Sequence, residues 1–319
     1  MWGANHVAAR SIRGEVVLSA LIFWRWVIAL VVLLPFAWPR LRAEAALLRR
    51  HARWIAAMGA VGVGMFSWLI HAAAYSAPAT DVALLGAMTP IWALLIAALL
   101  RIERIGPLQV AGAGCAVFGA ALILMQGRWH GAVSAIGIGH VWALLASIVF
   151  AGYSVLLGRR PQGLSVTSFT GTTAFAGTAL VAAPLYLADL VGGEGPFFAR
   201  TATLAPLHSL TVVFFMAIGP TLIANLLWAH GAKRVQPAAA ASMTCVTPLA
   251  ASLLSVALLG ESIHAYHLEG LAAICAGIAL TTRGSSRRAA LDRSAAAAAL
   301  PATPPARHIP AHGPIERSR

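Results

Sequence analysis

Nine stretches of about 20 residues with almost no charged side chains divide this chain, and they constrain its fold more than any other feature. An α-helix needs about 20 mostly apolar residues to cross a bilayer. The stretches are too long and too uniformly apolar for barrel strands, which alternate over about 10 residues. The chain is therefore predicted to be an all-α polytopic membrane protein. The predicted spans are Ser19–Trp38, Arg53–Ala74, Ala79–Leu100, Gly106–Met125, Ala135–Leu157, Ser168–Leu190, His208–His230, Pro237–Leu259 and Ala265–Thr282.

The overall composition excludes a soluble globular domain. Of the 319 residues, 59 % are hydrophobic and 10 % are charged, whereas soluble domains are about 45–50 % apolar and about 25 % charged. The three cysteines, Cys115, Cys245 and Cys275, all lie inside spans without CxxC spacing, so they are interpreted as small buried hydrophobic residues.

The net charge of +13 would suggest nucleic-acid binding in a soluble protein. With both termini in the cytoplasm, however, the basic residues that flank the spans collect strongly on the inside, and only Arg10, Arg13, Arg128 and Arg200 lie outside. This is the positive-inside bias of an inner-membrane protein. We therefore expect a multi-pass plasma-membrane protein with a cytoplasmic C-terminus and no nucleic-acid partner.

An internal repeat divides the chain into two halves. Shifting the sequence by 158 positions places Ala83–Leu122 on Ala241–Leu280, with 12 of 40 pairs identical, among them Thr89–Pro90 with Thr247–Pro248 and Glu103 with Glu261. Five spans per half is an odd number, so the second half enters the membrane from the opposite side. The prediction is a ten-helix inverted repeat (5+5).

The repeat also sets the expected domain boundaries. Residues 1–125 form the first repeat, 126–134 a linker and 135–282 the second repeat. The segment Met1–Ala9 reads as the end of an incomplete first helix, from which we expect roughly 12 to 16 residues to be missing. Residues 283–319, rich in Arg, Ala and Pro, are predicted to be a disordered cytoplasmic tail that either contacts anionic lipid headgroups or acts as a topology-fixing stop segment.

Both halves resemble the drug/metabolite transporter superfamily, in its EamA-type branch. The second half carries LWAHGAKRVQPAAAA (Leu227–Ala241), Thr247–Pro248 and LLGES (Leu258–Ser262). The first carries WGAN (Trp2–Asn5), AYSAPAT (Ala74–Thr80), Thr89–Pro90 and Glu103. Asp81 departs from the family, where small or weakly polar residues are commoner. The resemblance implies a ten-helix inner-membrane carrier of small metabolites, often amino acids or drugs, usually working outward.

Polar and aromatic residues within the spans are the candidates for a substrate cavity, because polar groups facing lipid are expensive. They are Asn5, Ser67, His71, Asp81, Thr89, Trp92, Trp142, Tyr153, Asn225 and Trp228. Each aromatic residue has packing as its alternative role.

Several of these residues have two interpretations that the sequence leaves open. Asp81 either binds a substrate amine or exchanges a proton, or it stabilises a helix N-terminus. His71 is either a proton acceptor or a histidine bonded to a neighbouring helix. Arg25 either pairs with a substrate carboxylate or extends its head to the interface. Pro90 and Pro248 are either gating hinges or static kinks.

Two further groups are assigned structural roles. Gly112, Gly119, Gly270 and Gly277 recur at seven-residue spacing and are expected to allow close helix contact. Glu103 and Glu261 lie beyond the ends of spans, so we assign them to loop structure.

A secondary transporter of small metabolites, exporting by alternating access, is the predicted function. A lipid-linked carrier or flippase on the same scaffold is the alternative, and a membrane-embedded enzyme is disfavoured because HExxH, GxSxG and paired intramembrane carboxylates are absent from the sequence. The expected partners are a small-molecule solute and the bilayer, and self-association as a homodimer is left open. No cofactor or metal is expected, and the chain lacks GxxxxGK[ST].

Overall fold

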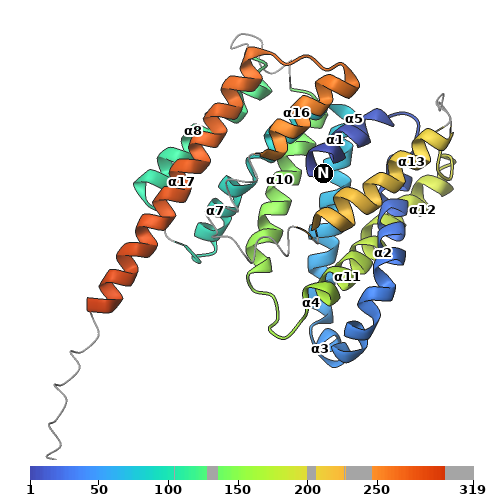
Figure 1. Cartoon of the computed structure of the whole chain (residues 1–319), viewed down its shortest axis with the longest axis horizontal. Coiled ribbons are helices and arrows are strands. Elements are labelled where there is room, and N and C mark those ends of the chain that lie inside the picture. The colour runs from blue at the N-terminus through green and yellow to red at the C-terminus, as the bar shows by residue number, and fades with distance from the viewer. Residues whose placement is uncertain (104, 128–135, 200–205, 226, 228–245, 299–319) are drawn as a thin grey trace, which may run out of the picture.

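The computed structural model describes residues 1–103, 105–127, 136–199, 206–225, 227 and 246–298 (Figure 1). Eight helices in this part are long and apolar enough to cross a membrane, which confirms the predicted all-α membrane fold. They are Leu18–Ala43, Ala52–Ser76, Ala79–Leu99, Pro107–Leu124, Ile138–Leu157, Val166–Val191, Pro206–Ile223 and Ala265–Arg287. The short α1 (Trp2–Ser11) precedes them, and α16 (Val246–Leu259) precedes the last. The second part of the span predicted at His208–His230 and the first part of that at Pro237–Leu259 lie outside the described residues.

Four of the spans are interrupted rather than straight. When α1 is counted as the first of ten spans, the third span consists of α4 (Ala52–Gly59), the π-helix η1 (Ala60–Met65) and α5 (Phe66–Ser76). The seventh consists of α11 (Val166–Gly177), η2 (Thr178–Ala182) and α12 (Ala183–Val191), and the eighth of α13 (Pro206–Met216) and η3 (Ala217–Ile223). The fourth is split into α6 (Ala79–Gly86) and α7 (Thr89–Leu99).

The remaining helices are continuous. They are α2 (Leu18–Ala43), α8 (Pro107–Leu124), α10 (Ile138–Leu157) and α17 (Ala265–Ala298), and the short α3 (Ala45–Arg50) follows α2.

The packing between helices follows the sequence repeat. The first span of each half packs against the fourth span of the other half, α1 against α16 and α10 against α7. The second span of each half packs against the third span of the other, α2 against η3 and α11 against α4. The fifth spans, α8 and α17, pack against each other along one edge of the molecule (Figure 1). These pairs are what two inverted copies related by a two-fold axis in the membrane plane require.

Glycines set the distance between α8 and α17. A Cβ atom on Gly112 would lie 2.6 Å from the carbonyl oxygen of Gly277, and one on Gly119 would lie 2.5 Å from that of Gly270. Near the centre of the crossing, the Sγ of Cys115 donates to the carbonyl oxygen of Ala273, its repeat equivalent, at 3.3 Å. The predicted close contact is therefore present, and it is made between the two repeats.

The C-terminal part differs from the predicted disordered tail. Instead of ending near Thr282, α17 continues to Ala298. Ser285 also packs within this helix against the start of α8, where its Oγ donates to Glu103 Oε1 at 2.9 Å and accepts from Gln109 Nε2 at 2.7 Å. Alanine and arginine are among the strongest helix formers, and no proline follows Thr282 before Pro301. The rest of the predicted tail, residues 299–319, lies outside the described residues.

Candidate functional site

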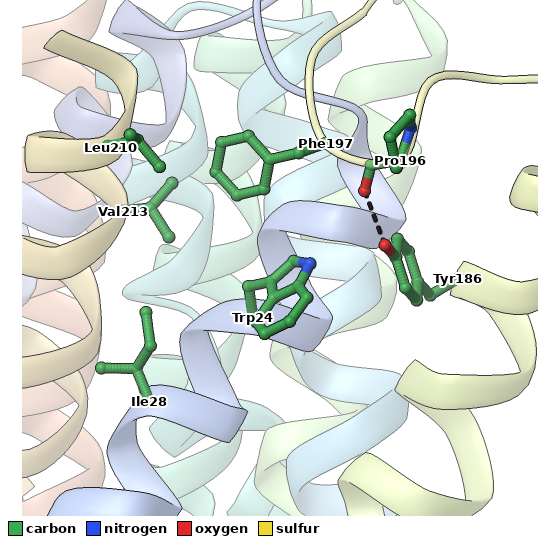
Figure 2. Close-up of a pocket in the computed structure, with 7 residues that line it drawn as sticks. All are labelled: Trp24, Ile28, Tyr186, Pro196, Phe197, Leu210 and Val213. Carbon is green, nitrogen blue, oxygen red and sulfur yellow. Dashed lines mark hydrogen bonds between the residues drawn. The ribbon is translucent and has the colours of Figure 1, made fainter. Parts of the chain in front are cut away.

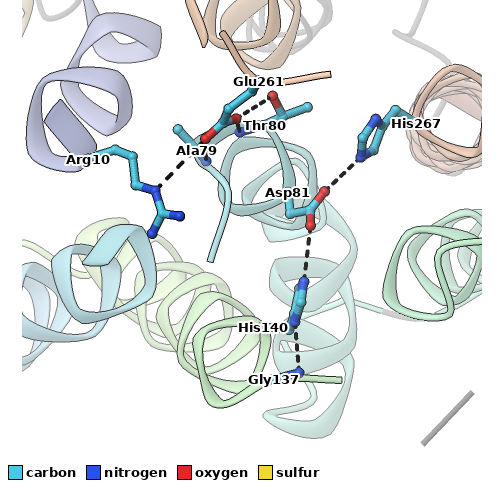
Figure 3. A network of polar contacts seen from close by, with 8 residues as sticks. All are labelled: Arg10, Ala79, Thr80, Asp81, Gly137, His140, Glu261 and His267. Carbon is cyan, nitrogen blue, oxygen red and sulfur yellow. Dashed lines mark hydrogen bonds and ion pairs between the residues drawn. The ribbon is translucent and has the colours of Figure 1, made fainter. Parts of the chain in front are cut away.

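Two sets of polar contacts lie side by side at one end of the helix bundle, as Figure 3 shows. This end, named here the Glu261 end, holds the N-termini of α6, α10 and α17. In the first set, the carboxylate of Asp81 accepts a hydrogen bond on each oxygen, from His140 Nε2 at 3.1 Å and from His267 Nε2 at 2.9 Å. The side chain of Asp81 is only 2 % exposed.

Both histidines are oriented by the helices that carry them. His140 Nδ1 accepts the backbone N–H of Gly137 at 3.1 Å, and His267 Nδ1 accepts that of His264 at 3.0 Å. Each is the third residue of its helix and bonds back to the N-cap residue, as in a capping box. Because Nδ1 is an acceptor, the proton is assigned to Nε2 in both rings, and each neutral histidine donates that proton to Asp81.

In the second set, Glu261 stabilises the N-terminus of α6. Its carboxylate accepts the backbone N–H groups of Ala79 and Thr80 at 2.9 and 3.1 Å, and the Thr80 hydroxyl at 3.0 Å. Arg10 lies 4.0 Å away and completes the set (Figure 3). The helix-terminus role that the sequence left open for Asp81 is thus carried by Glu261, a loop residue, while Asp81 binds the two histidines.

A second polar cluster lies deeper in the bundle and brings together three of the predicted residues. His71 Nδ1 donates to the carbonyl oxygen of Ser67 at 2.6 Å, and Asn5 Nδ2 lies 3.4 Å from His71 Nε2. The Ser67 hydroxyl accepts from Arg25 and from Trp26 Nε1, both at 2.9 Å. Arg25 is only 5 % exposed, so its head is turned into the protein rather than toward the interface.

The predicted aromatic residues line the contact between α5 and α10. Trp142 packs edge-on against Trp68, with ring centroids 5.1 Å apart. Tyr153 packs beside Phe150 at 5.9 Å and against Gly62 of η1. The Trp142–Trp68 and Tyr153–Gly62 contacts join the two repeats, whereas Phe150 and Tyr153 are neighbours on α10.

Two other predicted residues, Thr89 and Asn225, form hydrogen bonds to backbone carbonyl groups of their own span. Thr89 donates to the carbonyl oxygen of Gly86 at 2.7 Å, across the break between α6 and α7. The indole nitrogen of Trp92 is buried without a hydrogen-bond partner. Asn225 donates to the carbonyl oxygen of Thr221 in its own helix at 2.6 Å. Trp228 lies outside the described residues.

The two predicted hinges occupy different positions. Pro90 lies in the first turn of α7, directly after the break that divides the fourth span. Pro248 lies near the start of the described part of α16 and is buried. A proline lacks the N–H that would continue a preceding helix, which accounts for the break at Pro90.

A pocket of about 330 Å³ opens between α2, α12, α13 and the segment before Ala199 (Figure 2). Its lining residues are Trp24, Ile28, Tyr186, Pro196, Phe197, Leu210 and Val213, none of them charged. The Tyr186 hydroxyl is turned to the carbonyl oxygen of Pro196, 2.6 Å away. The pocket therefore suits an apolar group and offers little to a phosphate.

Sequence reasoning missed His140 and His267. The available signal was the repeat, which places Gln109, the third residue of α8, at the position equivalent to His267, so both halves carry a hydrogen-bonding side chain there. Gln109 Oε1 accepts the N–H of Gly106 at 2.7 Å, and its Nε2 donates to Glu103 at 3.0 Å. Within the described residues, no group of three or more His, Cys, Asp or Glu side chains is arranged to hold a metal ion.

Comparison with known proteins points to one family. The model of the EamA-like transporter family matches residues 1–125 and 137–283. The chain is 26 % identical over 233 residues to the probable terminal-alkyne amino-acid exporter of Streptantibioticus cattleyicolor, covering 72 % of each protein. It is 25 % identical over 216 residues to Protein PecM of Dickeya dadantii, covering 67 % of this chain and 68 % of that protein.

The fold is also shared with a solved structure described simply as the crystal structure of a protein. The TM-score is 0.61 at 22 % identity, and the match covers 88 % of this chain and 93 % of that one. At this identity the likeness concerns the fold alone.

Proposed function

Because the chain belongs to the EamA-like transporter family, we propose that this multi-pass membrane protein exports small metabolites of the amino-acid class from the cytoplasm by alternating access between its two repeats. The name of the Streptantibioticus relative supports this substrate class. The proposed location is the inner membrane, with the C-terminus in the cytoplasm and the Glu261 end facing outward, in keeping with the distribution of basic residues.

The observation that carries the proposal is the set of contacts at the Glu261 end. Asp81 belongs to the first matched region and its histidine partners to the second. Glu261 likewise joins the second region to Ala79, Thr80 and Arg10 of the first. Rocking one repeat against the other has to break these contacts, so they act as a lock that holds the outward end closed.

Asp81 is the proposed proton-coupling group of this lock. A carboxylate accepts from both histidines, whereas a protonated carboxyl group presents one O–H donor to a histidine N–H that is itself a donor. Protonation therefore loosens the lock and couples opening to proton entry. His71 is the second proposed proton acceptor, since its ring lies in the deeper polar cluster.

The remaining candidates form the proposed walls of the substrate pathway. Asn5, Ser67 and His71 supply polar contacts, and Thr89, Trp92, Trp142, Tyr153, Asn225 and Trp228 supply weakly polar and aromatic surface. Pro90 and Pro248 are the proposed hinges. Transport of a lipid-linked substrate is the alternative function for this fold. The pocket at α2, α12 and α13 does not favour it, because none of the lining residues is a cation that could bind a lipid phosphate.

Counterflow in proteoliposomes tests the proposal. Vesicles containing the full chain and unlabelled L-leucine, L-phenylalanine or L-propargylglycine are expected to accumulate the corresponding labelled amino acid. Asp81→Asn is expected to abolish the part of the flux that depends on a pH gradient, while Asp189→Asn, on α12 and outside the lock, serves as the matched control. Absence of flux for amino acids, sugars and cationic drugs alike would contradict a transporter. Flux that Asp81→Asn leaves unchanged would remove Asp81 from the coupling mechanism.

A further inference from the structure

The deeper polar cluster holds a buried cation, Arg25, that is paired with no counter-ion among the described residues. The guanidinium of Arg25 donates to Ser67 Oγ and lies 5.2 Å from the centroid of the Trp26 ring, while its buried Nε has no hydrogen-bond partner among the residues that the structure describes. No carboxylate is among its partners in the part of the chain that the structure describes. The internal segments outside that part, 104, 128–135, 200–205, 226 and 228–245, contain no Asp or Glu in the sequence.

A buried charge of this kind is costly unless an anion pairs with it. Ionisable groups inside a membrane protein are retained mainly for function, and they usually face a partner or a pathway. Arginine is suited to one kind of partner in particular, because its planar fork of N–H donors matches the two oxygens of a carboxylate. The missing anion is therefore expected to come from the transported solute.

The same cluster also has an unused acceptor. His71 donates its Nδ1–H to the Ser67 carbonyl oxygen, so its Nε2 is an acceptor and takes the Nδ2–H of Asn5. That contact fixes the orientation of the Asn5 amide and leaves Oδ1 buried, with no hydrogen-bond partner in the described part of the chain. An unpaired cation and an unpaired acceptor are thus joined through Ser67 and His71 in one connected network.

We propose that Arg25 and Asn5 form the subsite for the charged groups of an amino-acid solute, with the Arg25 guanidinium binding the α-carboxylate and Asn5 Oδ1 accepting from the α-ammonium. The inference rests on the proposed transport of amino-acid metabolites and adds the recognition chemistry. Ser67 and Trp26 position Arg25, and His71 positions Asn5. Solutes that lack the carboxylate are rejected, because the buried guanidinium is then left unpaired.

The test compares Arg25→Gln and Arg25→Lys with Arg40→Gln. Arg40 lies near the other end of the same helix and donates to Thr167 at an exposed position. The probes are labelled L-leucine, L-phenylalanine and L-propargylglycine, each with its methyl ester and its decarboxylated amine, measured by counterflow and by ligand-induced shifts in melting temperature. Arg25→Gln is expected to weaken the apparent affinity for the free amino acids at least tenfold, since the carboxylate of the solute then loses its charged partner in a buried site. The apparent affinity of Arg25→Lys is expected to lie between those of Arg25→Gln and the wild type, and the apparent affinity of Arg40→Gln is expected to equal that of the wild type.

The melting temperature distinguishes a role of Arg25 in recognising the solute from a purely structural role. Burying a charge that has no counter-ion costs free energy, so Arg25→Gln is expected to keep or raise the melting temperature while it loses the preference for free acid over ester. Asn5→Ala provides a second variant, expected to lose the preference for a free over an N-acetylated amino group.

The outcomes are distinct for the two proposals. If the wild type moves no amino acid, the proposed function fails. If the wild type moves amino acids but treats acid, ester and amine alike, the subsite fails while the transport function stands. A fall in melting temperature without a change in selectivity for Arg25→Gln would also overturn the subsite.

Discussion

The carboxylate of Asp81 and its two histidines are separated by 59 and 186 positions in the chain, yet all three side chains are almost fully buried together. Each histidine performs two tasks, since Nδ1 accepts from the start of its own helix while Nε2 donates across the repeat boundary. A substitution that keeps only one of these two hydrogen bonds should therefore differ in stability from a substitution that keeps both.

Glutamine should replace His267 with little loss of stability. Gln109, at the equivalent position of α8, accepts the N-cap N–H through Oε1 and donates to a carboxylate through Nε2. We expect the free energy of unfolding of His267→Gln to stay within about 1 kcal/mol of the wild type, and that of His267→Leu to fall by about 1–3 kcal/mol because an oxygen of Asp81 loses its donor. Thermal unfolding in detergent measures both. Equal stability of the two variants would show that this bond is unimportant.

Sequence patterns reached some of these residues and missed others for physical reasons. Asp81, His71 and Ser67 stood out because polar side chains are rare in membrane spans. The pairing of Asp81 with His140 and His267 depends on how three helix ends meet, and no periodicity within one helix records that. Whether the Arg25 side chain extends to the membrane interface or into the protein likewise depends on a contact with another helix, the hydrogen bond to Ser67.

At the scale of helices and loops, the spans and the glycine repeat were predictable because each leaves a periodic trace in one segment of sequence. The break between α6 and α7 follows from Pro90, whose kink the sequence raised as a possibility. The π-helical turns η1 and η2 were not predictable, since they lie beside the close contact of Gly59 with Gly177, which no single segment of sequence records. The glycine crossing of α8 and α17 is the element contact most open to a direct test.

Two glycines of α8 should respond in opposite ways to alanine. In Gly119→Ala the new methyl group meets the Gly270 carbonyl oxygen, whereas at Gly114 a Cβ atom has no neighbour within 4 Å. We expect Gly119→Ala to lower the free energy of unfolding by about 1–3 kcal/mol, and Gly114→Ala to leave it unchanged or raise it by up to about 1 kcal/mol through helix propensity. Melting curves of the two variants in the same detergent provide the comparison. If the free energy of unfolding of Gly119→Ala equalled that of the wild type, α8 and α17 would be able to move apart at little cost.

The connection from α2 to α11 should depend on pH. Glu44, outside the spans, accepts the backbone N–H of Ser165 at 3.0 Å. Burial raises the pKa of Glu44, but the hydrogen bonds from Ser165 and Ser168 and the charge of Arg40 outweigh it and hold the pKa below its ordinary value. A lowered folded-state pKa means that the stabilisation is present above the ordinary glutamate pKa and is lost as the pH falls through the lowered one.

Glu44→Gln removes this pH-dependent contribution. At neutral pH we expect the variant to be less stable than the wild type by less than about 1 kcal/mol, since the site is partly exposed. The difference in melting temperature should close as the pH is lowered through the folded-state pKa of Glu44. A difference that is constant with pH would indicate that the charge of Glu44 contributes nothing.

For the whole molecule, the sequence repeat and the observed packing describe the same arrangement, since the contact of α1 with α16 has its counterpart in that of α10 with α7, and the contact of α2 with η3 in that of α11 with α4. The domain boundaries at 125 and 135 and the orientation in the membrane remain predictions. The orientation follows from loop charges that have no effect on how the helices pack, so it requires its own experiment.

Labelling of single cysteines tests the orientation. In a chain whose three native cysteines are replaced by alanine, Gly193→Cys should react with a membrane-impermeant maleimide on intact cells, and Gly163→Cys only after the membrane is opened. Both glycines lie in loops with positive φ, at 83° and 87°, so the two substitutions carry similar strain. Labelling of Gly163→Cys in intact cells would reverse the proposed topology.

The α8–α17 contact also governs the timing of assembly. Cys115 and its partner Ala273 are 158 positions apart, and a ribosome adds about 5–20 residues per second, so α8 waits roughly 10–30 s for α17 to be synthesised. During that interval its glycine face has only lipid or the insertion machinery to cover it. The closely packed contact between α8 and α17 is consequently the last contact between the two halves to form. A nascent chain that stalls before α17 therefore exposes the glycine face of α8 to the membrane, where another helix can pack against it.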